Sequence, residues 1–121
     1  MDTLTSLEQA VLEKLLSGES EGYRILQKQI PTLRVAERKM TGVGFFTRFS
    51  LPDEAPKLPD EASLEISDVG ADLTDLKHGA GFVLFIRKGG INMLEGFTYG
   101  EPWPRDVRSF HLYYDGTSER V

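Results

Sequence analysis

The stretch that decides the fold is Phe82-Val-Leu-Phe-Ile-Arg-Lys-Gly-Gly-Ile-Asn-Met-Leu-Glu-Gly-Phe-Thr-Tyr99. Its first five residues are all apolar, which is typical of a central strand with both faces covered. Gly89-Gly90 fits a two-residue turn, because glycine accepts the positive φ that such a turn needs. The sequence therefore predicts an antiparallel hairpin in which Leu84 pairs with Glu95.

A second hairpin is predicted on the N-terminal side of the first. Residues 33–40 and 43–51 alternate around Thr41-Gly42, where Gly42 supplies the positive φ of a tight turn. The odd-numbered residues from Val43 to Leu51 form a nearly apolar face, which we expect to face the core. Further strands are expected at residues 62–69 and 107–114, and a turn at residues 115–116.

Two helices are predicted before the first strand. Thr5 and Glu8 have the spacing of a capping box, and apolar residues then recur at helical spacing through Leu16. A second helix is expected over residues 21–29, ending before Pro31; a strand is the alternative for this segment. Helices followed by closely connected strands favour an α+β fold. We expect residues 1–121 to form one domain, with an N-terminal helical pair packed on a mostly antiparallel sheet of about five strands.

Composition excludes several classes of function. The chain has 121 residues and no cysteine, so disulfides, thiolate metal sites and cysteine nucleophiles are excluded. The formal net charge of −5 is unlike that of a general nucleic-acid binder, and no apolar run is long enough to cross a membrane. The N-terminal residues do not follow the basic and then apolar order of a signal peptide. We expect a cytoplasmic protein without a cofactor, bound metal, nucleic acid or membrane contact.

Charge is unevenly distributed along the chain. Residues 24–48 hold six bases and one acid, whereas residues 52–76 hold eight acids and one base. The two segments either lie near each other and neutralise one another, or form a charged surface that selects a partner.

Glu95 is the candidate for acid–base chemistry. Four apolar residues share its expected strand face: Ile91, Met93, Phe97 and Tyr99. Burial of that face would desolvate a carboxylate among apolar groups, as happens in many acid–base sites. Alternatively, a bulge or register change exposes Glu95 to water, or a base such as Arg48 or Arg87 pairs with it.

The loop from Tyr99 to Pro104 is the candidate partner-binding segment. It holds Trp103, the only tryptophan, between two prolines. Aromatic side chains on such a loop provide contact area at a low entropic cost. Alternatively, Trp103 covers the end of the sheet as part of the core.

Two other groups of polar residues have simpler explanations than a binding site. Four possible metal ligands are bunched but match no calcium loop, and a solvated acidic loop explains them: Asp68, Asp72, Asp75 and His78. Four bases on the first hairpin resemble a nucleic-acid ribbon, although a solvated or acid-paired face is the simpler explanation: Arg34, Arg38, Lys39 and Arg48.

Three segments are similar to those of a group of small, uncharacterised bacterial proteins: Met40-Thr-Gly-Val-Gly-Phe-Phe-Thr47, Gly79-Ala-Gly-Phe-Val-Leu-Phe-Ile86 and Leu94-Glu-Gly-Phe-Thr-Tyr-Gly-Glu-Pro-Trp-Pro104. The resemblance covers about residues 30–105. It implies a small bacterial cytoplasmic domain, and it implies no activity, cofactor or catalytic residue.

Two functional hypotheses follow. The first is a non-enzymatic module that binds another protein, or a second copy of itself, through Arg48, Glu95, Tyr99 and Trp103; bacterial toxin-neutralising proteins are an analogy for this class. The second is a small enzyme or small-molecule binder in which Glu95 is the acid or base and Arg48 orients an anion. A flat sheet with an exposed aromatic patch would favour the first hypothesis, and a deep apolar pocket around Glu95 the second.

Overall fold

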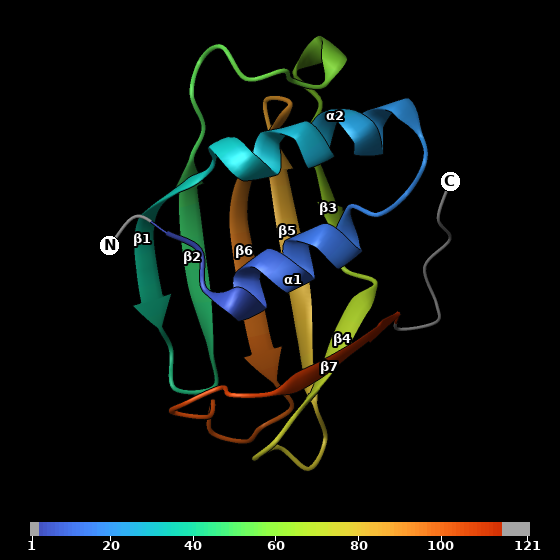
Figure 1. Cartoon of the computed structure of the whole chain (residues 1–121). Coiled ribbons are helices and arrows are strands. Elements are labelled where there is room, and N and C mark those ends of the chain that lie inside the picture. The colour runs from blue at the N-terminus through green and yellow to red at the C-terminus, as the bar shows by residue number, and fades with distance from the viewer. Residues whose placement is uncertain (1–2, 115–121) are drawn as a thin grey trace.

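Two helices precede seven strands in residues 3–114, which are the residues that the computed structural model describes (Figure 1). The helices are α1 (Ser6–Leu15) and α2 (Glu21–Gln29), and short 3-10 turns occupy Ile30–Thr32 and Pro59–Glu61. The strands are β1 (Arg34–Met40), β2 (Gly44–Ser50), β3 (Leu64–Ile66), β4 (Val69–Leu73), β5 (Ala80–Arg87), β6 (Gly90–Thr98) and β7 (Phe110–Tyr114). The α+β class is confirmed, and the turn expected at residues 115–116 lies outside the described residues.

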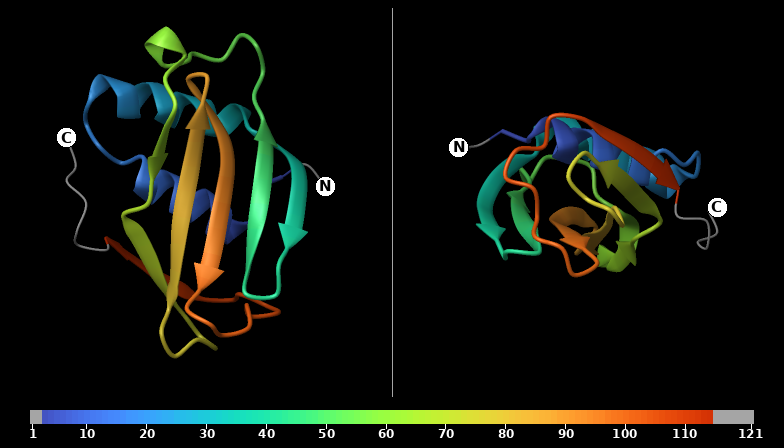
Figure 2. Two further views of the ribbon diagram at one scale, coloured as in Figure 1. Left: turned by 180° about the vertical axis from the view of Figure 1, so that it is seen from behind. Right: turned by 90° about the horizontal axis from the view of Figure 1, so that it is seen from below.

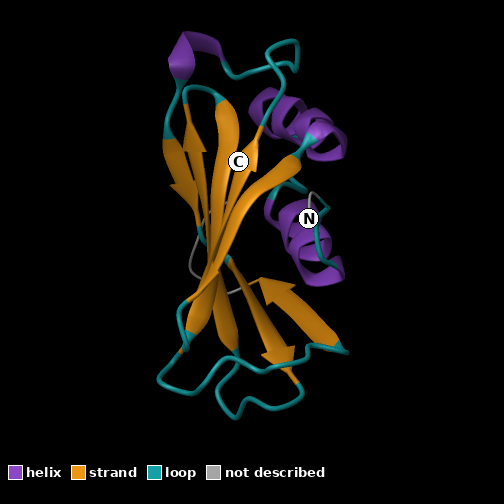
Figure 3. Ribbon diagram, turned by 90° about the vertical axis from the view of Figure 1, so that its left-hand side faces the viewer, coloured by secondary structure: helices purple, strands orange, loops and turns teal. Residues whose placement is uncertain are grey.

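The strands form one antiparallel sheet in the order β1-β2-β6-β5-β4-β7, with β3 also paired to β5. Both helices lie on the same face of this sheet, and the sheet curls around them (Figures 2 and 3). Neither of the two described helices covers the opposite face, as the view from behind shows (Figure 2). The sheet therefore has a helix-covered face and an open face.

Helix α1 begins at the capping box that the sequence predicts. The Thr5 hydroxyl accepts the N–H of Glu8 at 3.0 Å, and the Glu8 carboxylate accepts the N–H of Thr5 at 2.8 Å. These bonds satisfy two of the N–H groups that a helix start leaves without an internal partner. The apolar stripe behind the cap then packs on the covered face of the sheet.

The core lies between the helices and that face. The helices contribute Leu7, Val11, Leu12, Leu15, Leu16 and Leu26, and the sheet contributes Phe45, Phe49, Val69, Ala71, Phe82, Leu84, Ile86, Ile91 and Leu94. Phe45 and Phe49 belong to the face of residues 43–51 that was expected to be buried, and Thr47 between them has no exposed surface. Val43 is the exception, because it lies in the turn and is 48% exposed.

Gln29 ties the end of α2 to the rest of the fold. Its side chain has no exposed surface. The amide nitrogen donates to the carbonyls of Pro56 at 2.7 Å and Gly89 at 3.0 Å, and the amide oxygen accepts the N–H of Ile91 at 2.8 Å. One side chain thus holds α2 against the turn between β5 and β6 and against the proline-rich loop.

The expected register of the β5–β6 hairpin is wrong by two residues next to the turn and by one residue beyond the bulge. The turn is Lys88-Gly89, with φ values of 52° and 77°, and Gly90 already belongs to β6. A bulge then leaves Asn92 without an opposite residue, so Leu84 pairs with Leu94 rather than with Glu95. This shift places both Ile91 and Leu94 on the covered face, because burial of apolar side chains fixes strand register.

The sheet has more strands than the five or so that were expected. The single strand expected at residues 62–69 is two strands, β3 and β4, which pair with successive parts of β5. Strand β4 then continues to Leu73, because its other edge pairs with β7. Strand β7 starts at Phe110 rather than at residue 107.

We predict that Gln29→Met destabilises the protein by about 3 kcal/mol. Methionine fills a similar volume but leaves the Ile91 N–H and the Pro56 carbonyl without their buried partner, and each such group costs about 1–3 kcal/mol. Urea unfolding at neutral pH measures the change. Lys28→Met, at an exposed position of the same helix, is the matched control and should stay within about 0.5 kcal/mol of the wild type; equal effects of the two substitutions would contradict the role of Gln29.

Candidate functional site

The structure separates the four predicted site residues into two groups. Arg48, Glu95 and Tyr99 belong to the open face of the sheet, whereas Trp103 packs against Phe45 on the helix-covered side. The protein therefore has two candidate sites. The first is the open face around Glu95, and the second is the cavity that Trp103 lines.

Glu95 lies near the centre of the open face. Across the strands it is opposite Phe46 of β2 and Val83 of β5. Along β6 its neighbours on the same face are Met93 and Phe97. All five side chains are half-buried, although neither described helix lies on this face. Within residues 3–114 no side chain or backbone group forms a hydrogen bond or ion pair with the Glu95 carboxylate, so that carboxylate is open to a partner from outside the chain.

Aromatic rings extend this apolar surface toward one end of β6. The rings of Phe97 and Tyr99 meet edge to face with their centroids 5.6 Å apart, and Tyr99 is 56% exposed. They lie directly over Gly81 of β5, where an added Cβ would approach the Phe97 ring to 2.6 Å. Glycine at this position lets both side chains approach the backbone of β5 closely. The expected strand face of Glu95 is therefore open, apart from Ile91, which the bulge at Asn92 turns into the core.

Ion pairs flank the apolar centre of the open face. On β2, Arg48 donates to Glu37 at 2.6 Å; this hydrogen bond, with the charge of Arg48, lowers the pKa of Glu37. On the other side, Arg87 donates to Glu65 at 3.0 Å. Arg48 is thus engaged with Glu37 rather than poised to orient an anion beside Glu95.

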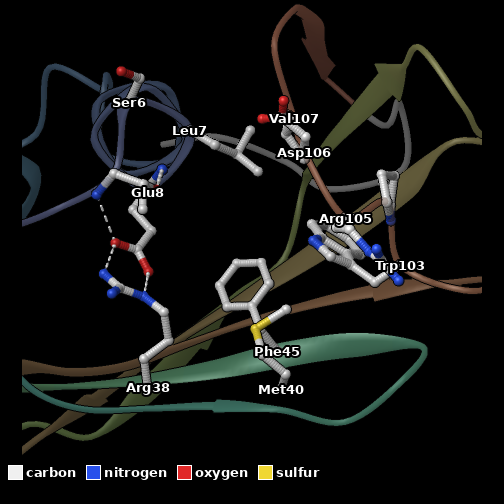
Figure 4. Close-up of a pocket in the computed structure, with 12 residues that line it drawn as sticks. Ser6, Leu7, Glu8, Arg38, Met40, Phe45, Trp103, Arg105, Asp106 and Val107 are labelled. Carbon is white, nitrogen blue, oxygen red and sulfur yellow. Dashed lines mark hydrogen bonds and ion pairs between the residues drawn. The ribbon is translucent and has the colours of Figure 1, made fainter.

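The second site begins at Glu8, whose role the sequence shows only in part. Besides capping α1, the carboxylate accepts Nε of Arg38 at 2.9 Å and Nη2 of Arg38 at 2.6 Å (Figure 4). It also accepts the hydroxyl of Thr47. Arg38 and Thr47 face each other across β1 and β2. Glu8 therefore joins the start of α1 to both strands of the first hairpin, while only 2% of its surface is exposed.

The environment of Glu8 keeps the carboxylate charged. Burial alone raises the pKa of Glu8, but hydrogen bonds from Arg38, Thr47 and the Thr5 N–H, with the charge of Arg38, outweigh burial and lower the pKa. The same carboxylate raises the pKa of Arg38 by accepting its hydrogen bonds. The pair is therefore a fixed ion pair with no net charge.

A cavity of about 310 Å³ opens beside this ion pair. Figure 4 shows Glu8 and Arg38 on one side of it, and Trp103 with Arg105 on the other. Its apolar lining is Leu7, Met40, Phe45, Trp103, Pro104 and Val107. The cavity thus combines a polar end, apolar walls and a second polar end.

Several contacts hold the Trp103 wall in place. The Trp103 N–H donates to the carbonyl of Gly42 at 2.8 Å, and its ring meets Phe45 edge to face with centroids 5.2 Å apart. The Glu101 carboxylate accepts the N–H groups of Lys77 and His78, each at 3.0 Å, and these bonds lower its pKa. The loop is therefore anchored to two other parts of the chain, and Trp103 covers part of the core.

The bunched acids and histidine do not assemble. Asp68 is buried in the break between β3 and β4, whereas Asp72, Asp75 and His78 are exposed. Among residues 3–114, no group of three or more histidine, aspartate or glutamate side chains is arranged to hold a metal ion. Neither described helix has the length and apolarity needed to span a membrane.

Comparisons of the chain with family models, with curated proteins and with solved structures find no match. The resemblance to small bacterial proteins therefore stays a prediction, and function must be argued from the two sites.

We predict that Glu8→Gln lowers stability most at neutral pH. The contribution of the carboxylate is complete above its ordinary pKa of 4.5 and is lost as the pH falls below it, because the unfolded state binds the proton more readily. Removing one member of a buried ion pair costs about 3 kcal/mol at pH values where both are charged. Urea unfolding of both proteins in neutral and in strongly acidic buffer measures the difference.

The matched control is Glu13→Gln, at an exposed position of the same helix. It should change the free energy of unfolding by less than about 0.5 kcal/mol at neutral pH. If the free energies of unfolding of the wild type and Glu8→Gln differ by the same amount in neutral and acidic buffer, the charge of Glu8 is not what stabilises the fold.

Proposed function

We propose that this protein is a non-enzymatic interaction module that binds a partner protein through the open face of its sheet. The observation that carries the proposal is the carboxylate of Glu95, with which no group within residues 3–114 pairs, at the centre of a half-exposed apolar surface. An apolar patch bounded by polar residues is typical of a protein-binding surface. Glu95 lies on an open strand face, which does not support an enzyme built on a deep pocket around it.

The charges define the chemistry of the partner. Glu37 pairs with Arg48 and Glu65 pairs with Arg87 at the flanks, so among these three described acids Glu95 is the one that remains available to a partner. A lysine or arginine side chain would satisfy it, and Phe46 and Phe97 beside Glu95 would contact the stem of that side chain. The partner is therefore a protein surface with a basic residue surrounded by apolar residues.

We predict that random-peptide display on the wild-type protein selects peptides with a lysine or arginine flanked by apolar residues. Glu95→Lys should lower the affinity for the selected peptides at least about tenfold, because two like charges then meet in a desolvated contact. Tyr99→Ser, at an exposed position, should lower the affinity for these peptides without affecting the fold. Amide NMR shifts should map the peptide to β2, β5 and β6.

Glu54→Lys is the matched control, because it makes the same charge change at an exposed loop position away from the open face. It should leave peptide affinity unchanged. Selection of acidic peptides, or equal affinity for wild type and a folded Glu95→Lys variant, would contradict the proposal. A dimer in solution that Glu95→Lys dissociates would instead assign the open face to a second copy of this chain.

A further inference from the structure

Charged residues lie at both ends of the cavity between α1, the first hairpin and the Trp103 loop. Four charged residues line it: Glu8, Arg38, Arg105 and Asp106. Glu8 and Arg38 cancel each other, and the Asp106 carboxylate accepts Nε of Arg108 at 2.7 Å. Within residues 3–114 Arg105 has no acidic partner. Of the charged residues that the structure describes, Arg105 is therefore the lining base with which no carboxylate pairs, and it lies at the end of the cavity that holds Trp103.

The apolar side chains that line the cavity determine which kind of apolar group a ligand can place there. Phe45 is 5% exposed and Leu7 is 7% exposed, so these side chains belong to the rigid core rather than to a mobile surface. The Trp103 ring stands at 70° to the Phe45 ring, and a backbone hydrogen bond to Gly42 holds the main chain of Trp103 in place. Ordered aromatic and aliphatic walls favour a flat or branched apolar group.

The size of the cavity limits the ligand to a small molecule. A volume of about 310 Å³ is at the lower end of the range that ligand pockets span, about 300–1,000 Å³. The opposite end is closed by the Glu8–Arg38 pair, whose hydrogen bonds α1 needs. The anionic group of a ligand would therefore lie toward Arg105.

We propose that this cavity binds a small organic anion: a carboxylic acid whose aromatic or branched apolar body lies between Leu7, Phe45 and Trp103 and whose carboxylate pairs with Arg105. The guanidinium of arginine pairs with carboxylates through two parallel hydrogen bonds, which favours an acid over its neutral amide. This site is on the helix-covered side of the sheet, so the proposal does not depend on the open face.

Trp103 is the only tryptophan, so its fluorescence reports on this cavity directly. The full-length protein is titrated with 3-phenylpropionate, 3-phenylpropionamide, 3-phenylpropylamine and acetate. We expect a saturable fluorescence change with 3-phenylpropionate. The amide should bind about tenfold more weakly, as expected for the loss of one charged contact. Acetate, which lacks the apolar body, and the amine, which carries the wrong charge, should give no saturable change.

Arg105→Gln tests the pairing at an exposed position that the fold does not need, and Lys28→Gln on α2 is the control for lost charge. Arg105→Gln should bind the acid and the amide with equal affinity. Lys28→Gln should bind the acid more tightly than the amide, as the wild type does. Amide NMR shifts of Leu7 and Val107 detect binding that leaves the fluorescence unchanged. No saturable binding by either method, equal affinity of the wild type for acid and amide, or an unchanged preference in Arg105→Gln would overturn the proposal.

Discussion

The buried carboxylate of Glu8 is the interaction on which the rest of the structure depends. The first N–H groups of helix α1 need a hydrogen-bond acceptor. The apolar side chains of the helix also bury its first turn against the sheet. A charged carboxylate in that position is stable only if hydrogen bonds replace water. Thr5, Arg38 and Thr47 provide those bonds. One side chain thus fixes the start of the helix, its position on the sheet and the spacing of the first hairpin.

This constraint separates the two faces of the sheet. Because α1 and α2 are both held on one side, by Glu8 and by Gln29, the buried apolar side chains of the sheet point toward them. The helices leave the other face open, with Glu95 among half-exposed side chains. The end of the covered side that α1 does not fill becomes the cavity beside Trp103. The two candidate sites therefore result from the same packing and can be tested independently.

Local patterns in the sequence predicted most of the fold. The capping box at Thr5 and Glu8, the end of α2 before Pro31 and the turn at Gly42 follow from short-range chemistry, and each is confirmed. Contacts between distant residues were not predictable. The bulge at Asn92 exists because both Ile91 and Leu94 are buried, and this shift turns Glu95 outward. Thr47 on an otherwise apolar face signalled that a buried partner was needed, but Glu8 and Arg38 could be assigned to it only from the packed structure.

The most direct test of this account is a double-mutant cycle between Glu8 and Arg38. The free energy of unfolding is measured in urea at neutral pH for the wild type, Glu8→Gln, Arg38→Gln and the double variant. If the ion pair fixes α1 to the hairpin, the second substitution costs little once the first is made, with a coupling energy of about 1–3 kcal/mol. If the two single effects add within about 0.5 kcal/mol, the pair does not hold the fold together and the account is wrong.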